Sequence, residues 1–156
     1  MKEHEAEYQD SSEAQVAAGS SSLANAGKYG DGQFGFEVLE VYQAARRFRN
    51  RAYKLAALLP ESEKFALMQQ MRWAAVSVTS NIAEGYGRYT WQEATHFCHN
   101  SRGSLMEVVD HINVCRDQQY AQSDHLDDLR TDALQVLQLL NGYIRYLQNK
   151  KQTHKR

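Results

Sequence analysis

The chain has 156 residues and a formal net charge of −1 at pH 7; 42% of its residues are hydrophobic and 24% are charged. These values are ordinary for one soluble globular domain, and one proline with nine glycines cannot supply the turns of a many-stranded sandwich or barrel. The longest apolar run, residues 55–59, is far shorter than the roughly 20 residues of a membrane span, and we expect no secretory signal.

The first 35 residues differ in composition from the rest of the chain. They carry six acidic and two basic residues, a balance of −4, and five of the nine glycines. A segment so poor in large apolar side chains cannot offset the entropy that it would lose on ordering. We therefore predict a flexible acidic leader over residues 1–35, a folded domain over residues 36–149 and a basic tail over residues 150–156.

A helical pattern of apolar residues begins near residue 36. Spacings of three and four residues predict the inner face of a first helix, which Pro60 ends because proline lacks a backbone donor. The residues of this stripe are Val38, Val41, Ala45, Phe48, Ala52, Leu55 and Leu59. The stripe of a second helix consists of Met68, Met71, Ala75, Val78 and Ile82. Gly85 and Gly87, which are free to take a left-handed conformation, end that helix.

Two further helices are predicted in the second half of the chain. Thr90 and Glu93 form a capping box at the start of the third helix. Its inner stripe is Ala94, Cys98, Ser101, Leu105, Val108, Ile112 and Cys115. Ser123 is predicted to cap the fourth helix, in which early aspartates complement the helix dipole. The fourth stripe is Leu126, Leu129, Ala133, Val136, Leu140, Tyr143 and Leu147.

Four helices of about twenty residues with short connections predict an all-α fold, an antiparallel up-down-up-down four-helix bundle. The two cysteines, Cys98 and Cys115, are predicted to share one helix. At ~1.5 Å per residue they lie roughly 25 Å apart, which is too far for a disulfide. A reducing cytoplasm is the simplest setting for such a chain.

The predicted second and third helices carry a recognisable pair of motifs. They are Ser80-Asn81-Ile82-Ala83-Glu84-Gly85-Tyr86-Gly87-Arg88 and, after Phe97, Arg102-Gly103-Ser104-Leu105 with Glu107. Together with Leu59-Pro60-Glu61-Ser62-Glu63, they resemble the four-helix-bundle proteins named after the 23S rRNA intervening sequence. Accessory proteins of diversity-generating retroelements are similar to the same family. The resemblance covers residues 36–148 and implies a homopentamer without catalytic activity or cofactors, with a role involving RNA or a reverse transcriptase.

The motif residues have a physical interpretation that needs no ligand. A carboxylate at Glu84 could accept backbone N–H groups at the start of the third helix, and the Asn81 amide could satisfy carbonyls at the end of the second. The small residues Ser101, Gly103 and Ser104 would let helices approach closely. The corner that we single out consists of Asn81, Glu84, Gly85, Arg102, Gly103 and Ser104. A subunit contact or a ligand remains the alternative role for Asn81 and Glu84.

Several patterns look like enzyme or metal sites but lack their context. Gly30, Gly32 and Gly35 match a dinucleotide fingerprint without a preceding strand, so chance composition explains them better. Glu93 and His96 make half of a di-iron motif, and no second half occurs. Two pairs of possible ligands, His96 with His99 and His111 with Cys115, lie too far apart along one helix to share a metal ion. We therefore predict a protein that is not an enzyme and has no metal site, with metal binding across subunits as a remote alternative.

A cluster of basic residues is the strongest candidate for a binding surface. Five bases without an acid fall within nine residues, and arginine side chains suit phosphate. The predicted nucleic-acid contacts are Arg46, Arg47, Arg49, Arg51, Lys54, Lys150 and Lys151. A solvated helix face is an equally good interpretation for a domain of such low net charge.

Apolar residues outside the inner stripes predict oligomerisation, because they exceed what a monomeric bundle buries. They are Leu39, Tyr42, Leu58, Trp73, Val76, Leu137 and Ile144. Two functions follow as hypotheses. The first is an oligomeric accessory that presents a basic surface to RNA, DNA or a reverse transcriptase. The second is a structural or protein-interaction oligomer with no nucleic-acid partner.

Overall fold

A computed structural model describes residues 32–153, and the predicted leader therefore lies almost entirely outside the described residues. Four long helices dominate this part of the chain: α2 (Glu40–Ala56), α3 (Leu67–Tyr86), α4 (Trp91–Asp117) and α5 (Ser123–Thr153). Two short 3-10 turns, η2 (Gly35–Val38) and η3 (Glu61–Glu63), precede α2 and α3. The described residues include no strand, as the all-α prediction requires.

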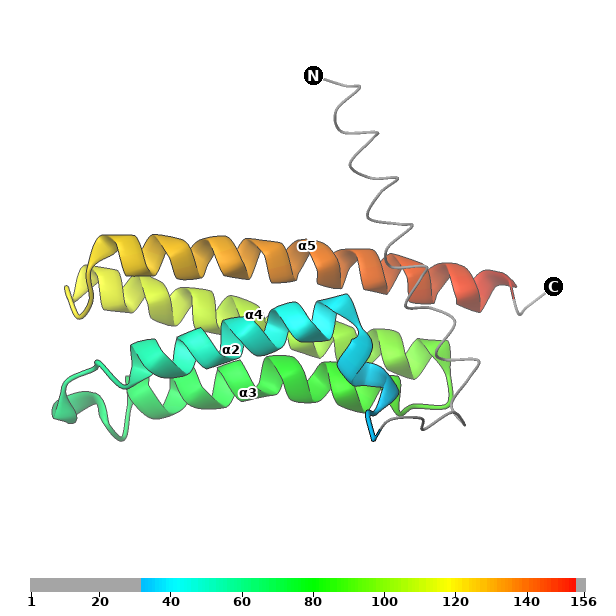
Figure 1. Ribbon diagram of the computed structural model, residues 1–156, viewed down its shortest axis with the longest axis horizontal. Helices are drawn as coiled ribbons and strands as arrows, with labels where there is room; N and C mark the ends of the chain where they lie inside the picture. The colour runs from blue at the N-terminus through cyan, green and yellow to red at the C-terminus, as the bar shows by residue number, and fades with distance from the viewer. Residues whose placement is uncertain (1–31, 154–156) are drawn as a thin grey trace, which may run out of the picture.

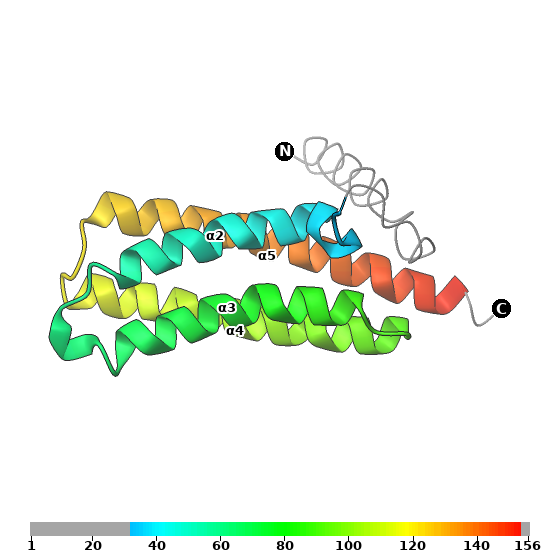
Figure 2. The same ribbon diagram turned by 60° about the horizontal axis from the view of Figure 1, so that its bottom comes forward.

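The chain reverses direction at each connection, so that sequential helices run side by side in opposite directions (Figures 1 and 2). Helix α2 packs against α3 and α5, and α4 packs against the same two helices. Cross-helix contacts agree with this arrangement. Lys151 near the end of α5 bonds to Gln92 at the start of α4, whereas Arg116 at the end of α4 pairs with Asp127 at the start of α5.

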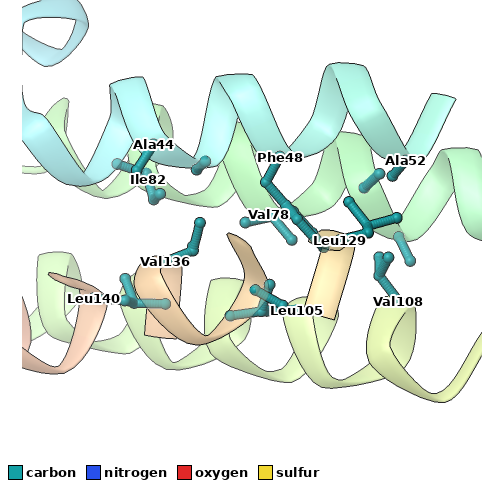
Figure 3. Packing of buried hydrophobic residues seen from close by; sticks show 14 of the residues in the cluster. Ala44, Phe48, Ala52, Val78, Ile82, Leu105, Val108, Leu129, Val136 and Leu140 are labelled. Atoms are coloured by element: carbon teal, nitrogen blue, oxygen red, sulfur yellow. The ribbon is translucent and has the colours of Figure 1, made fainter. Parts of the chain in front are cut away.

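The interior is filled by the predicted apolar stripes, which meet between the helices (Figure 3). Of all the stripe residues, only Val38 is exposed and only Met68 is partly buried; the others are buried. Val38 is exposed, unlike the rest of its stripe, because the first helix does not begin at residue 36. The chain forms η2 first, takes an extended conformation at Leu39, and then enters α2.

The end of α3 differs from the prediction in one respect. Gly87 follows the last helical residue with φ −77°, and Gly85 lies inside α3. Neither glycine takes a left-handed conformation. A Cβ at Gly85 would lie 3.0 Å from Cβ of Phe97 and 3.1 Å from the carbonyl oxygen of Ala94. Gly85 is therefore explained by the close approach of α3 and α4, rather than by backbone conformation.

The remaining local predictions are largely confirmed. Pro60 follows the end of α2 by a short turn. Thr90 accepts a hydrogen bond from the backbone N–H of Glu93 at 3.2 Å and donates its own hydroxyl proton to that residue's carboxylate at 2.7 Å. Cys98 and Cys115 lie on α4 as free, buried thiols. Between residues 32 and 153, no helix combines the length and apolarity of a membrane span.

Candidate nucleic-acid interface

Some basic side chains of α2 are exposed, and others are bonded to residues of neighbouring helices. Arg46 and Arg47 are exposed. Arg49 is only partly exposed, because its guanidinium donates to the hydroxyl of Thr79 on α3 at 3.1 Å. The five bases therefore do not form one uniform surface, and each must be assigned from its own surroundings.

Arg51 is held by α5. Its guanidinium lies 2.5 Å from the carboxylate of Asp132 and 3.4 Å from that of Asp128. These aspartates lie about one and a half and two and a half turns into α5. A phosphate would have to displace two carboxylates to reach this guanidinium. Arg51 is thus a poor phosphate ligand despite its place in the basic cluster.

Lys54 lies farther along α2, close to the start of α5. It is exposed and borders a hollow of about 220 Å³. The hollow is lined by Arg51, Lys54, Leu55, Leu58, His125 and Leu129. Two of the lining residues, His125 and Leu129, are sequence neighbours of Asp124 and Asp128 in α5.

The two lysines assigned to the basic tail belong to α5, which continues to Thr153. Lys151 donates to the side chain of Gln92 at 3.1 Å, and the ammonium of Lys150 lies 5.6 Å from the ring centre of Tyr146. Such a cation–π contact leaves the positive charge in place. Both charges are therefore fixed at the end of a helix instead of trailing beyond it.

Hydrogen bonds between neighbouring helices mark the middle of the bundle: Arg49–Thr79, Ser77–Ser104 and Arg102–Asn141. We use this level to divide the described chain into two halves. The basic half contains residues 32–49, 77–103 and 141–153. The acidic half contains residues 50–76 and 104–140.

Charge is distributed unequally between these halves. The basic half has eight Arg and Lys side chains against four Glu, a balance of +4. Its bases are Arg46, Arg47, Arg49, Arg88, Arg102, Arg145, Lys150 and Lys151. The acidic half has six bases against nine acids, a balance of −3. Arg88 and Arg145 were not predicted from the sequence as part of this surface, because their membership of the basic half depends on how the helices are paired.

The first motif forms a polar contact between α3 and α4. Asn81 donates its amide protons to the backbone carbonyl of Ser77 at 2.8 Å and to its hydroxyl at 3.0 Å. The Ser77 hydroxyl lies 2.8 Å from that of Ser104 in the second motif. Asn81 thus binds one turn back within α3, not at the open helix end, and Ser77 links it to the second motif on α4.

Glu84 and the second motif depart from their expected roles. The Glu84 carboxylate pairs with Arg88 and does not cap the start of α4. Arg102 donates to Asn141 on α5 at 3.3 Å. Gly103 is exposed, and a Cβ placed on it would meet nothing within 4 Å. Ser101 does make the expected close approach, because its buried hydroxyl donates to the carbonyl of Val78 at 2.8 Å, and Gly85 makes another.

The enzyme-like patterns do not assemble into a described site. Gly30 lies outside the described residues. His96 and Glu93 border a shallow hollow at the start of α4, and His99 is exposed. His111 is buried, with Nε2 3.7 Å from the carboxylate of Glu107. Among residues 32–153, no three His, Cys, Asp or Glu side chains come together as a metal site would require.

Three of the seven apolar residues expected to drive oligomerisation are exposed. They are Leu58, Trp73 and Val76, with Trp73 at 64%. Leu39 and Ile144 instead belong to the core, and Tyr42 and Leu137 pack partly against it. Leu39 turns inward at the break between η2 and α2. The buried face of α5 is wider than one stripe because this helix packs against both α2 and α4.

Comparison with known proteins agrees with this architecture. No curated protein matches the chain significantly. Residues 37–142, which span most of the bundle, match the family described as 23S rRNA-intervening sequence protein. The chain belongs to this family of 23S rRNA-intervening sequence proteins.

Proposed function

We propose that this protein is a non-enzymatic, oligomeric accessory that presents its basic half to the phosphates of nucleic acid, RNA in the first instance. The observation that carries this proposal is the +4 balance of the basic half against −3 in the other half. A field of this kind attracts a polyanion to one end of the bundle even though the whole chain is almost neutral.

Exposure and existing contacts together select the side chains that would bind phosphate. Arg46, Arg47 and Arg145 are exposed in the basic half, and the charges of Lys150 and Lys151 lie at the end of α5. Arg88 and Arg102 are also exposed but are already bonded to Glu84 and Asn141. Arginine forks match phosphate oxygens in pairs. Copies of one such surface in an oligomer would add further contacts to the same strand and raise the overall affinity.

A structural or protein-interaction oligomer is the second candidate function. It is favoured by Trp73 and Val76, which leave apolar area exposed on the outer side of α3. Under this alternative the bases serve contacts between subunits or with a protein such as a reverse transcriptase. The two candidates share an oligomer and differ in whether the isolated protein binds nucleic acid.

Fluorescence anisotropy with a labelled single-stranded RNA separates these candidates. The test variant is Arg46→Gln with Arg47→Gln, which removes two exposed charges from the basic half. The matched control is Lys54→Gln with Lys64→Gln, which removes two exposed charges from the acidic half. The proposal predicts weaker binding for the first pair and nearly unchanged binding for the control. Equal losses, or no binding by the intact protein at 50 mM salt, would favour the second candidate.

A further inference from the structure

The described part of the chain begins at residue 32, which lies in the basic half. Phe36 in η2 packs edge-on against Tyr42 on α2, with ring centres 4.8 Å apart, and against Tyr86 at the end of α3, at 6.4 Å. In both views η2 lies at the same end of the bundle as the end of α5 (Figures 1 and 2). Residues 1–31 therefore join the fold beside its positive charges.

The sequence of residues 1–31 is divided by charge. Residues 1–13 contain five acids and one base, a balance of −4, whereas residues 14–27 contain no charged side chain. The acidic stretch thus has the same magnitude of charge as the basic half and the opposite sign. This complementarity names the occupant, because a stretch of net negative charge is covalently attached next to a surface of net positive charge.

The connection is long enough for the two to meet. The 18 residues from 14 to 31 can span at most about 60 Å when extended. The basic segment of α2, about ten residues, is only about 15 Å long. Covalent attachment also raises the effective concentration of a tethered ligand to the millimolar range, so that several weak, screened ion pairs suffice for binding.

We propose that residues 1–13 bind the basic half of their own chain, on the bases of α2 and of the end of α5. The carboxylates would occupy the positions that nucleic-acid phosphates take under the proposed function. The contact itself does not depend on that function. Its consequence, that the acidic stretch competes with nucleic acid and lowers its affinity, rests on it.

Zero-length carbodiimide cross-linking of the full chain tests this contact, because it joins a carboxylate to a lysine amine only where the two touch. The expected links connect residues 3–13 to Lys150 and Lys151. Lys54 and Lys64 are exposed in the acidic half and serve as internal controls that should remain unlinked to this stretch. Peptide mass spectrometry of the monomer band would identify the links.

A higher salt concentration and a variant with fewer acidic residues test whether the cross-links depend on charge. Raising the salt from 50 mM to 1 M shortens the screening length to about 3 Å and should reduce the links at least fivefold. Glu3→Gln with Glu5→Gln and Glu7→Gln should reduce the remaining links of Asp10 and Glu13 while the helical circular dichroism stays unchanged. Links spread equally over all four lysines, links confined to covalent dimers, or no links at 50 mM salt would overturn the inference.

RNA binding by the same triple variant separates this inference from the proposed function. Specific links together with tighter RNA binding by the variant support both. Specific links in a protein that binds no RNA uphold the contact and refute the proposed function. RNA binding that the variant leaves unchanged, with evenly spread links, refutes the contact alone.

Discussion

The guanidinium of Arg51 on α2 lies 2.5 Å from the carboxylate of Asp132 on α5. This ion pair joins the cluster of bases in one helix to the cluster of acids in another. It shows why the local sequence of α2 overstates its positive surface: part of the charge is neutralised by a segment 81 residues away in the chain. The positive surface that remains lies toward the opposite end of the bundle.

Arg51 and Arg47 should therefore behave differently when each is changed to glutamine. Arg47→Gln should weaken RNA binding several-fold and reduce the salt slope by about 0.7 for one lost phosphate contact on a single strand. Arg51→Gln should leave the affinity within about twofold and cost roughly 0.2–1 kcal/mol of stability, because the Arg51 ion pair is partly exposed. Anisotropy and urea unfolding measure the two effects; the reverse order of affinities would contradict the assignment.

Two glycines of the family motifs should respond in opposite ways to alanine. Gly85→Ala places a methyl group 3.0 Å from Cβ of Phe97 and should destabilise the bundle by about 1–3 kcal/mol through overpacking. Gly103→Ala enters open space on the surface of α4 and should stabilise it by roughly 0.5–1 kcal/mol. Denaturant unfolding of both variants measures whether the free energy of unfolding falls for Gly85→Ala and rises for Gly103→Ala. A stable Gly85→Ala protein would show that α3 and α4 are less closely packed at this point.

The exposed indole of Trp73 should contribute to oligomer formation. Burial of an aromatic side chain favours association, and a carboxylate in its place opposes it. Light scattering coupled to size exclusion should give about five protomers for the intact chain, the number that the family resemblance implies, and smaller species for Trp73→Glu. Tyr89→Glu, at a fully exposed position between α3 and α4, is the control and should keep the oligomer intact. A monomeric intact chain at micromolar concentration would contradict this prediction.

Alkaline pH should destabilise the fold through its buried thiols. Burial raises the pKa of Cys98 to about 12, and burial together with the nearby Glu63 carboxylate raises the pKa of Cys115 to about 11. In the unfolded chain both thiols have their ordinary pKa of 9.0, so above that pH the folded state binds more protons and stability falls as pH rises. Each thiol contributes up to about 1.4 kcal/mol per pH unit.

Thermal unfolding between pH 8 and pH 10.5 measures this loss. Cys98→Ala should flatten the decline above pH 9 while lowering the melting temperature at pH 8, because it leaves a cavity. At pH 8 the thiols of the folded protein should resist a thiol reagent that reacts with both after unfolding. Rapid labelling of the folded protein would show that α4 opens more readily than its packing suggests.

The spacing of apolar residues predicted the four-helix bundle, because the buried face of each helix is set by residues only three or four positions apart. Every residue predicted for the inner stripes of α4 and α5 is buried. Turn conformations were harder to predict. Gln119 takes a positive φ of 56° after α4, although no glycine marks that turn, whereas Gly87 has an ordinary helical φ. At these two turns the residue type therefore did not identify the left-handed position.

The candidate nucleic-acid interface could be predicted only in part, because its residues come from helices that are distant in the sequence. The sequence identifies Arg46 and Arg47 as neighbours, but it does not reveal which distant residues lie beside them. Arg145 falls in the basic half and Arg51 faces acids only because α5 returns antiparallel to α2. The roles of Asn81 and Glu84 were missed because each has a partner on its own helix or connection, Ser77 and Arg88.

The central claim is that the basic half binds nucleic-acid phosphate, and the salt dependence of RNA affinity tests it most directly. Anisotropy of the full chain with one labelled single strand would be measured at salt concentrations from 50 to 200 mM. If four phosphates are neutralised, log affinity should fall with log salt at a slope of about −2.8, a loss of roughly 50-fold over this range. Arg145→Gln with Lys150→Gln and Lys151→Gln should make the slope shallower. A slope near zero, or one that this triple variant leaves unchanged, would contradict the claim.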